Sequence, residues 1–333
     1  MSADEFDTIR DLFAPLARSA GARALSDDVA VIEASGQLVV TTDAIVEGVH
    51  FLADDPIETI AKKALRVNIS DLTAKGAKAV GALLTLIWPT HRPAAEIKDF
   101  ARGLGEDLRL FDVALLGGDT ASTPGPLTVS IAAFGVALAA SGRVPSRADA
   151  RSGDHVWVTG FIGDAYLGLR ALSDGPDLID AKAGDRSGFD DLIDCYRVPR
   201  PPVRFAEAIG RYASASTDVS DGLAADAANI ARASKAALHI HAEAIPLSGS
   251  GHAYASKHGS RGLAELATGG DDYQVLFTAA PEERGAIVEA ARRAGVNASL
   301  IGDVVDGEGV KITTSLGVCL DLGAFGHRHK LGR

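Results

Sequence analysis

The sequence predicts an α/β (α+β) protein of two domains. In both halves of the chain, short apolar runs with strand character alternate with longer stretches of helical periodicity, a pattern typical of mixed α/β folds. With 333 residues the chain is long enough for two ordinary domains with ample cores. Periodicity stops over residues 141–147, where turn residues take over, so we expect domains over 1–140 and 150–333.

The N-terminal half should contain helices at 1–20, 56–75 and 93–110. The strands are expected at 29–32, 38–42, 82–87, 113–116 and 127–138. Pro56 at a tolerated first-turn position and Gly76 just past the end mark the limits of the second helix. Within that helix Asn68 and Asp71 are three residues apart and should share a face.

In the C-terminal half we expect strands at 155–159, 237–241 and 273–278, with two or three short strands near the end. The helices are expected after Gly163 and at 202–212, 223–234 and 281–294. Residues 173–187 are rich in Gly and Asp and should form a mobile loop.

Composition narrows the class of protein. The net charge of -11 disfavours nucleic acid or an anionic membrane as the main partner. The two cysteines, Cys195 and Cys319, lie far apart without a CxxC pattern, so neither a disulfide framework nor a zinc site is indicated. We find no signal-peptide pattern, and the longest apolar stretch is too short to span a bilayer. The sequence thus predicts a cytoplasmic protein.

Aspartates in short turn-like contexts are the most informative residues, and most of them follow an apolar run. They are Asp28, Asp43, Asp71, Asp119, Asp218 and Asp221. In an α/β fold this pattern would place them at the carboxyl ends of strands, where ligands bind. Carboxylates gathered there repel one another unless a cation neutralises them, and Mg²⁺ shares its shell between carboxylates and substrate phosphates. A single Asp is more often a turn former or helix cap, but the joint pattern indicates a Mg²⁺–nucleotide enzyme.

Familiar phosphate-binding motifs are absent from the sequence, including GxxxxGK[ST] and the protein-kinase signatures. Gly117 and Gly118 could let backbone N–H groups approach a phosphate. Arg143 and Arg147 are candidate phosphate clamps, although surface arginines would explain them equally well.

Six strings resemble the thiamine-monophosphate kinase family of the aminoimidazole ribonucleotide synthetase superfamily, in that family's order over nearly the whole chain. They are Asp-Asp-Val-Ala at 27–30, Thr-Thr-Asp at 41–43 followed by Gly-Val-His-Phe at 48–51, Lys-Ala-Leu-Arg-Val-Asn-Ile-Ser-Asp-Leu-Thr-Ala-Lys-Gly-Ala at 63–77, Gly-Gly-Asp-Thr at 117–120, Asp-Val-Ser-Asp-Gly-Leu at 218–223 and Thr-Gly-Gly-Asp-Asp-Tyr at 268–273. The resemblance implies ATP-dependent phosphorylation of thiamine monophosphate to thiamine diphosphate.

The resemblance also implies the site. Several Mg²⁺ ions would be held by Asp28, Thr41, Thr42, Asp43, Asp71, Asp119, Asp218 and Asp221. ATP would contact Gly118, Asp119, Arg147 and Ser220. Thiamine monophosphate would contact His50, Asp271 and Phe325. No residue is expected to act as a strong general base, because the acceptor is a phosphate oxygen that is already anionic. The implied assembly is a homodimer whose N-terminal mixed sheets pair into a barrel, with a C-terminal α/β sandwich closing over the nucleotide.

Three positions depart from the family's usual pattern. Ser26 stands where Gly is common, and Asp271 and Gln274 stand where Glu is common, which bears on substrate contacts. Two alternatives stay open at this point. One is another ATP-using member of the superfamily with a different acceptor, and the other is a non-catalytic nucleotide-binding regulator.

Overall fold

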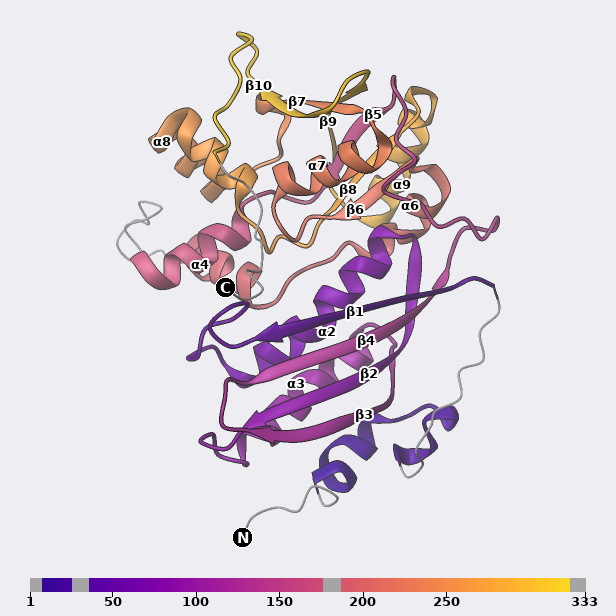
Figure 1. The fold of residues 1–333 in the computed structure, drawn as a ribbon, viewed down its shortest axis with the longest axis vertical. Helices are drawn as coiled ribbons and strands as arrows, with labels where there is room; N and C mark the ends of the chain where they lie inside the picture. The colour runs from indigo at the N-terminus through magenta and orange to yellow at the C-terminus, as the bar shows by residue number, and fades with distance from the viewer. Residues whose placement is uncertain (1–7, 26–35, 176–186, 324–333) are drawn as a thin grey trace. The chain divides into compact units, whose positions relative to one another are not determined.

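The computed structural model describes residues 8–25, 36–175 and 187–323 (Figure 1). The chain forms two compact units. The first, here the N-terminal unit, comprises Met1–Leu72 and Ala77–Ala137, and the second, the C-terminal unit, comprises Thr73–Gly76 and Leu138–Arg333. None of the helices in the described ranges is long and apolar enough to cross a membrane.

In the described part of the N-terminal unit, a four-stranded sheet has the order β1-β4-β2-β3. The strands are β1 (Leu38–Val46), β2 (Ala77–Pro89), β3 (Ala114–Thr123) and β4 (Thr128–Ala137). Strands β2 and β3 are parallel, and α3 (Glu96–Leu110) connects them, whereas β4 runs antiparallel to β1 and β2. Helices α2 (Ile57–Ala74) and α3 cover one face of the sheet (Figure 1). The sheet is therefore mixed. The parallel pair is possible because α3 provides the crossover that parallel neighbours need, whereas the short connection from β3 to β4 reverses the chain direction.

One face of this sheet is not covered by α2 and α3. Along β4, buried Val129, Ile131 and Ala133 alternate with partly exposed neighbours. On β1 the outward residues Leu38 and Val40 are 45% and 56% exposed. We call this the open face of the sheet.

In the described part of the C-terminal unit, a six-stranded sheet has the order β10-β7-β9-β5-β8-β6. Its strands are β5 (His155–Thr159), β6 (Ser216–Asp218), β7 (Ala237–His241), β8 (Val275–Ala279), β9 (Ala298–Val305) and β10 (Gly309–Thr313). The surrounding helices are α4 (Asp164–Asp174), α5 (Ser187–Arg197), α6 (Ala206–Tyr212), α7 (Leu223–Ser234), α8 (Gly249–Thr268) and α9 (Arg284–Ala294). Short 3₁₀ turns are η5 (Val203–Phe205), η6 (Ala242–Ala244) and η7 (Pro281–Glu283).

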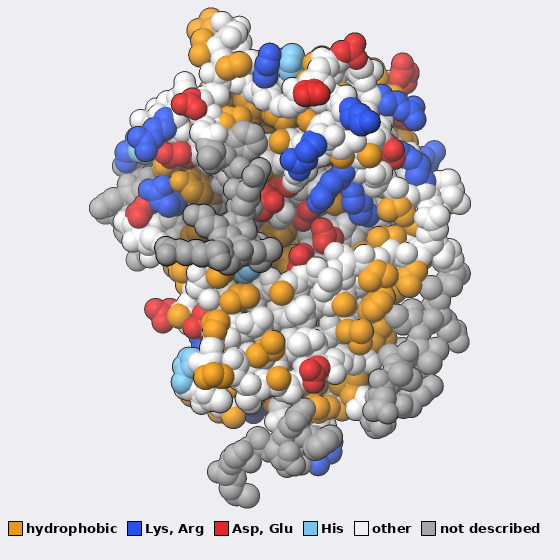
Figure 2. All heavy atoms as spheres, in the orientation of Figure 1, with side chains coloured by type: hydrophobic (Ala, Val, Ile, Leu, Met, Phe, Trp, Pro, Cys, Tyr) orange, Lys and Arg blue, Asp and Glu red, His pale blue; other side chains and the backbone are white. Residues whose placement is uncertain are grey.

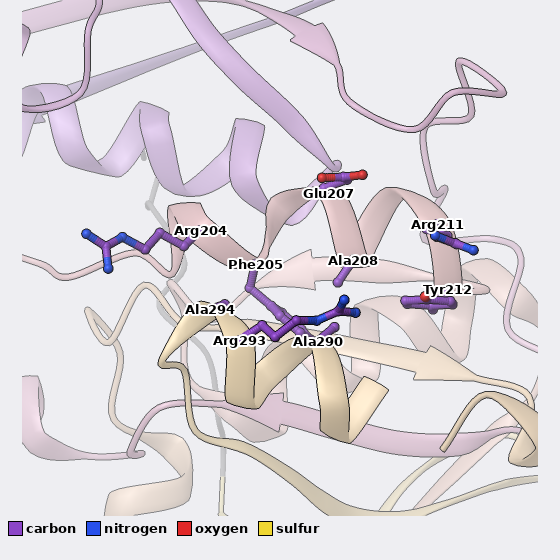
Figure 3. Close-up of a pocket in the computed structure, with 9 residues that line it drawn as sticks. All are labelled: Arg204, Phe205, Glu207, Ala208, Arg211, Tyr212, Ala290, Arg293 and Ala294. Atoms are coloured by element: carbon purple, nitrogen blue, oxygen red, sulfur yellow. The ribbon is translucent and has the colours of Figure 1, made fainter. Parts of the chain in front are cut away.

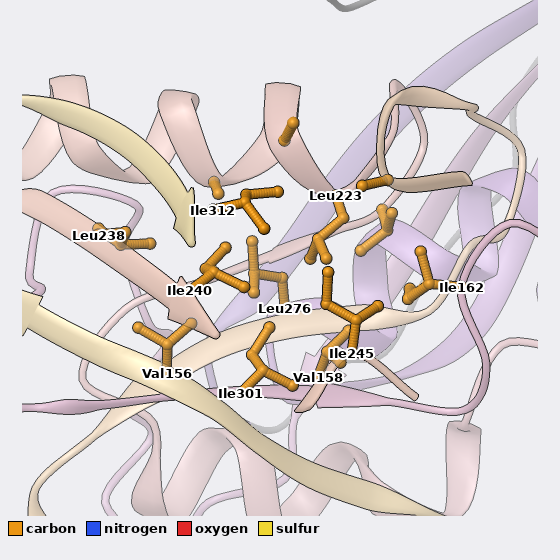
Figure 4. Close-up of a cluster of buried hydrophobic side chains, with 14 of the residues drawn as sticks. Val156, Val158, Ile162, Leu223, Leu238, Ile240, Ile245, Leu276, Ile301 and Ile312 are labelled. Carbon is orange, nitrogen blue, oxygen red and sulfur yellow. The ribbon is translucent and has the colours of Figure 1, made fainter. Parts of the chain in front are cut away.

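Both faces of the C-terminal sheet are packed. Val156, Val158 and Leu276 belong to one apolar cluster, shown in Figure 4, with Leu223 of α7. Trp157, between the two valines, belongs to another cluster that includes Phe277 of β8 and Ile287 of α9. Since neighbouring residues of a strand point to opposite faces, this alternation defines a sandwich of helices on both sides of the sheet.

Most predicted elements are confirmed, but some are not. The single helix expected over 1–20 is wrong for its described part, which forms η1 (Ile9–Phe13, a π-helix), η2 (Ala14–Leu16) and η3 (Ala20–Leu25), the latter two 3₁₀. Pro15 has no N–H to continue a helical ladder, which explains the break. The strand at 29–32 and most of the loop at 173–187 lie outside the described residues.

Sequence analysis missed α5, α8 and β6. Helix α8 contains several glycines, which are poor helix formers, and Gly259 interrupts its helical dihedral angles at φ 61°. Strand β6 has only three residues. Strand β3 extends from the predicted apolar run through Gly117, Gly118 and Asp119, so this string is part of a strand and not a turn after it.

Candidate functional site

In the N-terminal unit, one group of predicted site residues lies where β1 faces α2. The Thr41 hydroxyl donates to the Asp71 carboxylate at 2.5 Å, and the Asp43 backbone N–H donates to Oδ1 of Asn68 at 3.0 Å. Asn68 is fully buried and its amide donates back to the Ala64 carbonyl of α2. Asn68 and Asp71 therefore share a helix face, as the sequence predicted, and that face brings Thr41, Asp43 and Asp71 into one oxygen-rich neighbourhood.

The prediction that the aspartates lie at strand ends is wrong for Asp43 and Asp119, which lie inside β1 and β3. Asp71 lies in α2, which confirms its predicted place in the helix at 56–75. Asp218 is the last residue of β6, as expected. The strands extend beyond their apolar runs because α2 and α3 cover one face of the N-terminal sheet and leave the other open, so polar residues can continue the strand (Figure 1).

Strand register separates Thr42 and Asp119 from this neighbourhood. Thr42 alternates with Thr41 and Asp43 on β1, so its side chain lies on the open face. Asp119 pairs with Thr85, which in turn pairs with Ser130, so the Asp119 side chain also lies on the open face. Asp43 instead pairs with buried Ile131, so its side chain lies on the face that α2 and α3 cover. Strands β4 and β2 lie between β1 and β3, a separation of roughly 14 Å at about 4.8 Å per strand. A single chain thus does not bring Asp119 to Asp43 within this unit.

Gly118 sits opposite Leu84 of β2 in the same ladder. A Cβ atom at Gly118 would lie 1.9 Å from the Leu84 carbonyl oxygen, so the strand contact itself requires glycine there. This requirement is independent of the predicted contact between Gly118 and ATP.

In the C-terminal unit, two loops carrying predicted site residues are paired through their backbones. The N–H of Asp271 donates to the Ser220 carbonyl at 2.9 Å, and the N–H of Tyr273 donates to the Val219 carbonyl at 2.8 Å. Asp271 and Tyr273 have positive φ angles of 72° and 49°, which are costly for residues other than glycine and mark backbone held by its surroundings. A Cβ at Gly270 would lie 2.4 Å from the Ser220 carbonyl oxygen, so this close approach also needs glycine. The loops 218–222 and 269–273 therefore form one rigid arrangement.

Asp226, which sequence analysis did not single out, anchors the first of these loops. Its carboxylate accepts N–H groups from Ser220 and Asp221 at 3.1 and 3.0 Å, and the residue is 1% exposed. Burial, and then the neighbouring Asp221 carboxylate, raise the pKa of Asp226 to about 7. An acidic residue in the first turn of a helix directly after the Asp-Gly string is the signal that could have identified it.

Asp272 has a different role from its neighbour Asp271. Its carboxylate accepts the N–H groups of Gly163 and Ala165 at 2.7 and 3.2 Å and so caps α4. Burial raises the pKa of Asp272 well above its usual value. Asp271, by contrast, is partly exposed on the paired loops.

The two candidate phosphate-binding arginines differ. Nε of Arg147 donates to the Thr217 hydroxyl at 3.0 Å, next to Asp218. The guanidinium of Arg143 donates to the carbonyls of Ala213 and Ser214, so it braces the backbone before β6 instead of extending as a clamp.

Gln274 is also part of the internal bonding of the C-terminal unit. Its side-chain oxygen accepts from the Thr159 hydroxyl at 3.0 Å and its amide donates to the Arg200 carbonyl at 3.2 Å. These contacts give the residue a structural role.

His50 follows β1 in the N-terminal unit. Its Nδ1 accepts the Val46 N–H at 3.0 Å, and its carbonyl accepts from the ammonium of buried Lys63 at 2.8 Å. Since Nδ1 accepts a hydrogen bond, the proton of the neutral ring is on Nε2, which is then a donor and not a base. Asp28 and Phe325 lie outside the described residues.

Among the residues that the structure describes, no group of three or more His, Cys, Asp or Glu side chains is close enough to hold a metal ion. A cavity of about 360 Å³ in the C-terminal unit is lined by α6, α9 and neighbouring residues and contains none of the predicted site residues. Figure 3 shows Arg211, Tyr212 and Arg293 along it.

Comparison with known proteins identifies the class. Residues 26–137 match the N-terminal domain of AIR synthase related proteins, and residues 151–315 match the C-terminal domain of the same family. The chain is 42% identical over 311 residues to the thiamine-monophosphate kinase of Caulobacter vibrioides, covering 92% of this chain and 85% of the relative. It is 34% identical to the Escherichia coli (strain K12) enzyme of that name, over 84% of this chain and 83% of the relative. The chain belongs to the thiamine-monophosphate kinase family.

Solved structures agree with this assignment. The crystal structure of thiamine-monophosphate kinase from Stenotrophomonas maltophilia K279a has a TM-score of 0.77 at 34% identity, covering 86% of this chain and 89% of that one. The structure of AaThiL complexed with AMPPCP and TMP has a TM-score of 0.76 at 30% identity, covering 97% of each chain. The predicted family and the mixed α/β fold are therefore confirmed.

Proposed function

We propose that this protein transfers the terminal phosphoryl group of ATP to thiamine monophosphate, giving ADP and thiamine diphosphate. The observation that carries the proposal is the pairing of the Ser220 loop with the Asp271 loop, which brings a predicted ATP contact and a predicted acceptor contact together. Membership of the family supports the same reaction, as does the similarity to a structure complexed with AMPPCP and TMP.

We propose the following roles at the matching positions. Metal ions would be held by Asp28, Thr41, Thr42, Asp43, Asp71, Asp119, Asp218 and Asp221. ATP would contact Gly118, Asp119, Arg147 and Ser220, and thiamine monophosphate would contact His50, Asp271 and Phe325. The Thr42 side chain lies on the opposite face of β1 from Asp43. Thr42 would therefore bind a metal ion either on the open face or through its backbone carbonyl.

The donors at the interface of β1 and α2 fit Mg²⁺. Thr41, Asp43 and Asp71 supply only oxygen atoms, and hard divalent cations prefer oxygen ligands. When bound, Mg²⁺ would neutralise charge on the phosphates and help to orient them.

The protein's own residues account for the rest of the mechanism. The acceptor oxygen is anionic near neutral pH, so positioning and neutralisation dominate and no proton need be removed. Arg147, held by Thr217 beside Asp218, would bind a phosphate of ATP. His50 would donate a hydrogen bond from Nε2 to thiamine monophosphate, and Asp271 would help to orient the same substrate. In-line transfer then depends on how rigidly the paired loops hold the two substrates.

A direct test measures ADP release with ATP and Mg²⁺, comparing thiamine monophosphate with thiamine, thiamine diphosphate and aminoimidazole precursors. Release only with the monophosphate, with thiamine diphosphate as the product, supports the proposal. Release with another acceptor would identify a different member of the superfamily. ATP binding without release with any acceptor would favour a nucleotide-binding regulator.

We also propose that the protein is a homodimer that pairs through the open face of its N-terminal sheet. Leu38 and Val40 are 45% and 56% exposed, opposite Val136 and Phe134 of β4. Figure 2 shows hydrophobic side chains gathered on the visible surface of this unit. Apolar surface of this kind is typical of interaction sites. Asp119 lies on the same face, so pairing there would place it at the interface, available to the partner.

Light scattering tests the dimer, and mixing two variants tests the shared site. The inactive Asp71→Asn and Asp119→Asn proteins are mixed and allowed to exchange subunits. If Asp119 serves the partner's site, half of the dimers are mixed and each mixed dimer has one intact site of two. The mixture should then regain up to about a quarter of wild-type activity. No recovery in a confirmed mixed dimer would place Asp119 in the site of its own chain.

A further inference from the structure

We infer that Asp226 is a positioning residue that holds the ATP loop (residues 218–222) and the acceptor loop (residues 269–273) in a common geometry. The inference rests on the proposed function for the identity of the two substrates. Asp226 lies in the first turn of α7 and is not among the residues proposed to contact substrate.

The first step is the double hydrogen bond to the ATP loop. One oxygen of Asp226, Oδ2, accepts two consecutive backbone N–H groups, from Ser220 and Asp221. Two donors on a single acceptor fix the orientation of both peptide planes. The direction in which the Ser220 and Asp221 side chains leave the backbone follows from that orientation.

The second step continues the chain of bonds to the acceptor loop. The peptide of Ser220 is held by its N–H to Asp226, and its carbonyl oxygen accepts the N–H of Asp271 at 2.9 Å. Gly270 lies against this carbonyl so closely that a Cβ would be 2.4 Å away. A displacement of Ser220 is therefore passed to Asp271, and the two substrate contacts move together.

The third step is that α7 does not require this carboxylate for its own start. The backbone N–H of Asp226 already donates to the Gly222 carbonyl, and the carboxylate points back to the preceding loop. A buried carboxylate is costly unless its hydrogen bonds are satisfied. Its Oδ2 atom accepts both loop N–H groups, at 3.1 and 3.0 Å, whereas Oδ1 accepts the Asn229 amide of α7 at 3.4 Å. The two shorter bonds to the loop that bears Ser220 and Asp221 are the argument for positioning.

The test compares Asp226→Ala with Asp226→Asn and with a matched control. Asparagine keeps an oxygen that can accept the two N–H groups, whereas alanine removes it. Asp154→Ala is the control, because Asp154 is 4% exposed in the same unit and accepts one backbone N–H, from Arg151 at 3.0 Å, in a turn without proposed site residues. For each protein we would measure kcat, KM for ATP, KM for thiamine monophosphate, Tm, and AMPPCP affinity by calorimetry with Mg²⁺.

We expect Asp226→Ala to raise both KM values at least about tenfold, the effect of losing roughly 1.4 kcal/mol of interaction. Asp226→Asn should restore both to within about threefold of wild type, and Asp154→Ala should lower Tm without raising either KM. Unchanged KM values in folded Asp226→Ala, or equal increases in Asp154→Ala, would overturn the inference.

Two further measurements keep the inference testable. If Asp226→Ala does not fold, Gly270→Ala should raise both KM values by displacing the same Ser220 carbonyl, and a folded Gly270→Ala with normal KM values would refute the coupling. If the wild-type protein does not use thiamine monophosphate, the proposed function fails separately. Positioning of the ATP loop is then judged by AMPPCP affinity, which should fall in Asp226→Ala and not in Asp154→Ala.

Discussion

Asp71→Asn should separate catalysis from folding stability. The carboxylate of Asp71 accepts the Thr41 hydroxyl at 2.5 Å and is partly exposed between α2 and β1. Asparagine preserves an acceptor for this hydroxyl, so the cost to the free energy of unfolding should stay below about 1 kcal/mol. The lost negative charge should lower turnover about 10²- to 10³-fold, the effect of removing one electrostatic group from a reaction site, or roughly 2.7–4 kcal/mol.

Asp107→Asn is the matched control, because it makes the same chemical change at a structural position. The Asp107 side chain is 3% exposed and accepts two hydrogen bonds from Arg66, at 2.5 and 2.9 Å. Neutralising it leaves the Arg66 charge without its carboxylate partner, which should cost about 3 kcal/mol of stability. Turnover per folded molecule should stay close to the wild-type value.

The assay is thiamine-monophosphate-dependent ADP release, with urea denaturation of the same preparations. If Asp71→Asn retains more than half of wild-type turnover, Asp71 does not belong to the site. If the two variants lose stability equally, the distinction between a partly exposed functional carboxylate and a buried paired one is wrong. A normal Asp71→Asn would also remove the main support for a Mg²⁺ site between β1 and α2.

Three other predictions concern packing, pH and thiol reactivity. Gly118→Ala should lower the free energy of unfolding by about 1–3 kcal/mol or more, because its Cβ would lie 1.9 Å from a carbonyl oxygen of β2. Gly117→Ala meets only a side-chain methyl at 3.3 Å, so equal losses in urea melts of the two variants would contradict this reasoning. The pKa of Asp272 is raised by burial, so its contribution to stability is full below the unfolded pKa of about 3.9 and is lost as pH rises through the folded pKa. Urea denaturation should therefore show that the free energy of unfolding of Asp272→Asn increases relative to wild type as pH rises. If the two free energies change in parallel with pH, the pKa of Asp272 is not raised. Burial raises the pKa of Cys195 to about 11, whereas Cys319 is exposed, so Ellman's reagent at pH 8 should label Cys319 at least about tenfold faster. A Cys319→Ser variant that reacts at the wild-type rate would refute this.

Local patterns predicted much of the fold. The strand at 155–159, the helix at 223–234 and the strand at 237–241 were predicted with the limits that the structure has. Each is a periodic apolar segment, and glycine or polar residues flank the first two directly, so nearby sequence is sufficient to define them. Helix α8 was missed because its glycines and polar residues hide the helical period, and its place is determined by packing against α4 and α7.

The sequence by itself determined the kind of chemistry, because oxygen-bearing side chains in fixed short strings limit which ligands can bind. It identified Asp43, Asp71 and the Asp-x-Ser-Asp-Gly string without any knowledge of contacts. Only the tertiary structure decided which of these residues meet. Strand register puts Asp119 on the open face, and backbone pairing joins Ser220 to Asp271. Such long-range hydrogen bonds depend on how distant segments pack, and local sequence carries no direct record of that packing.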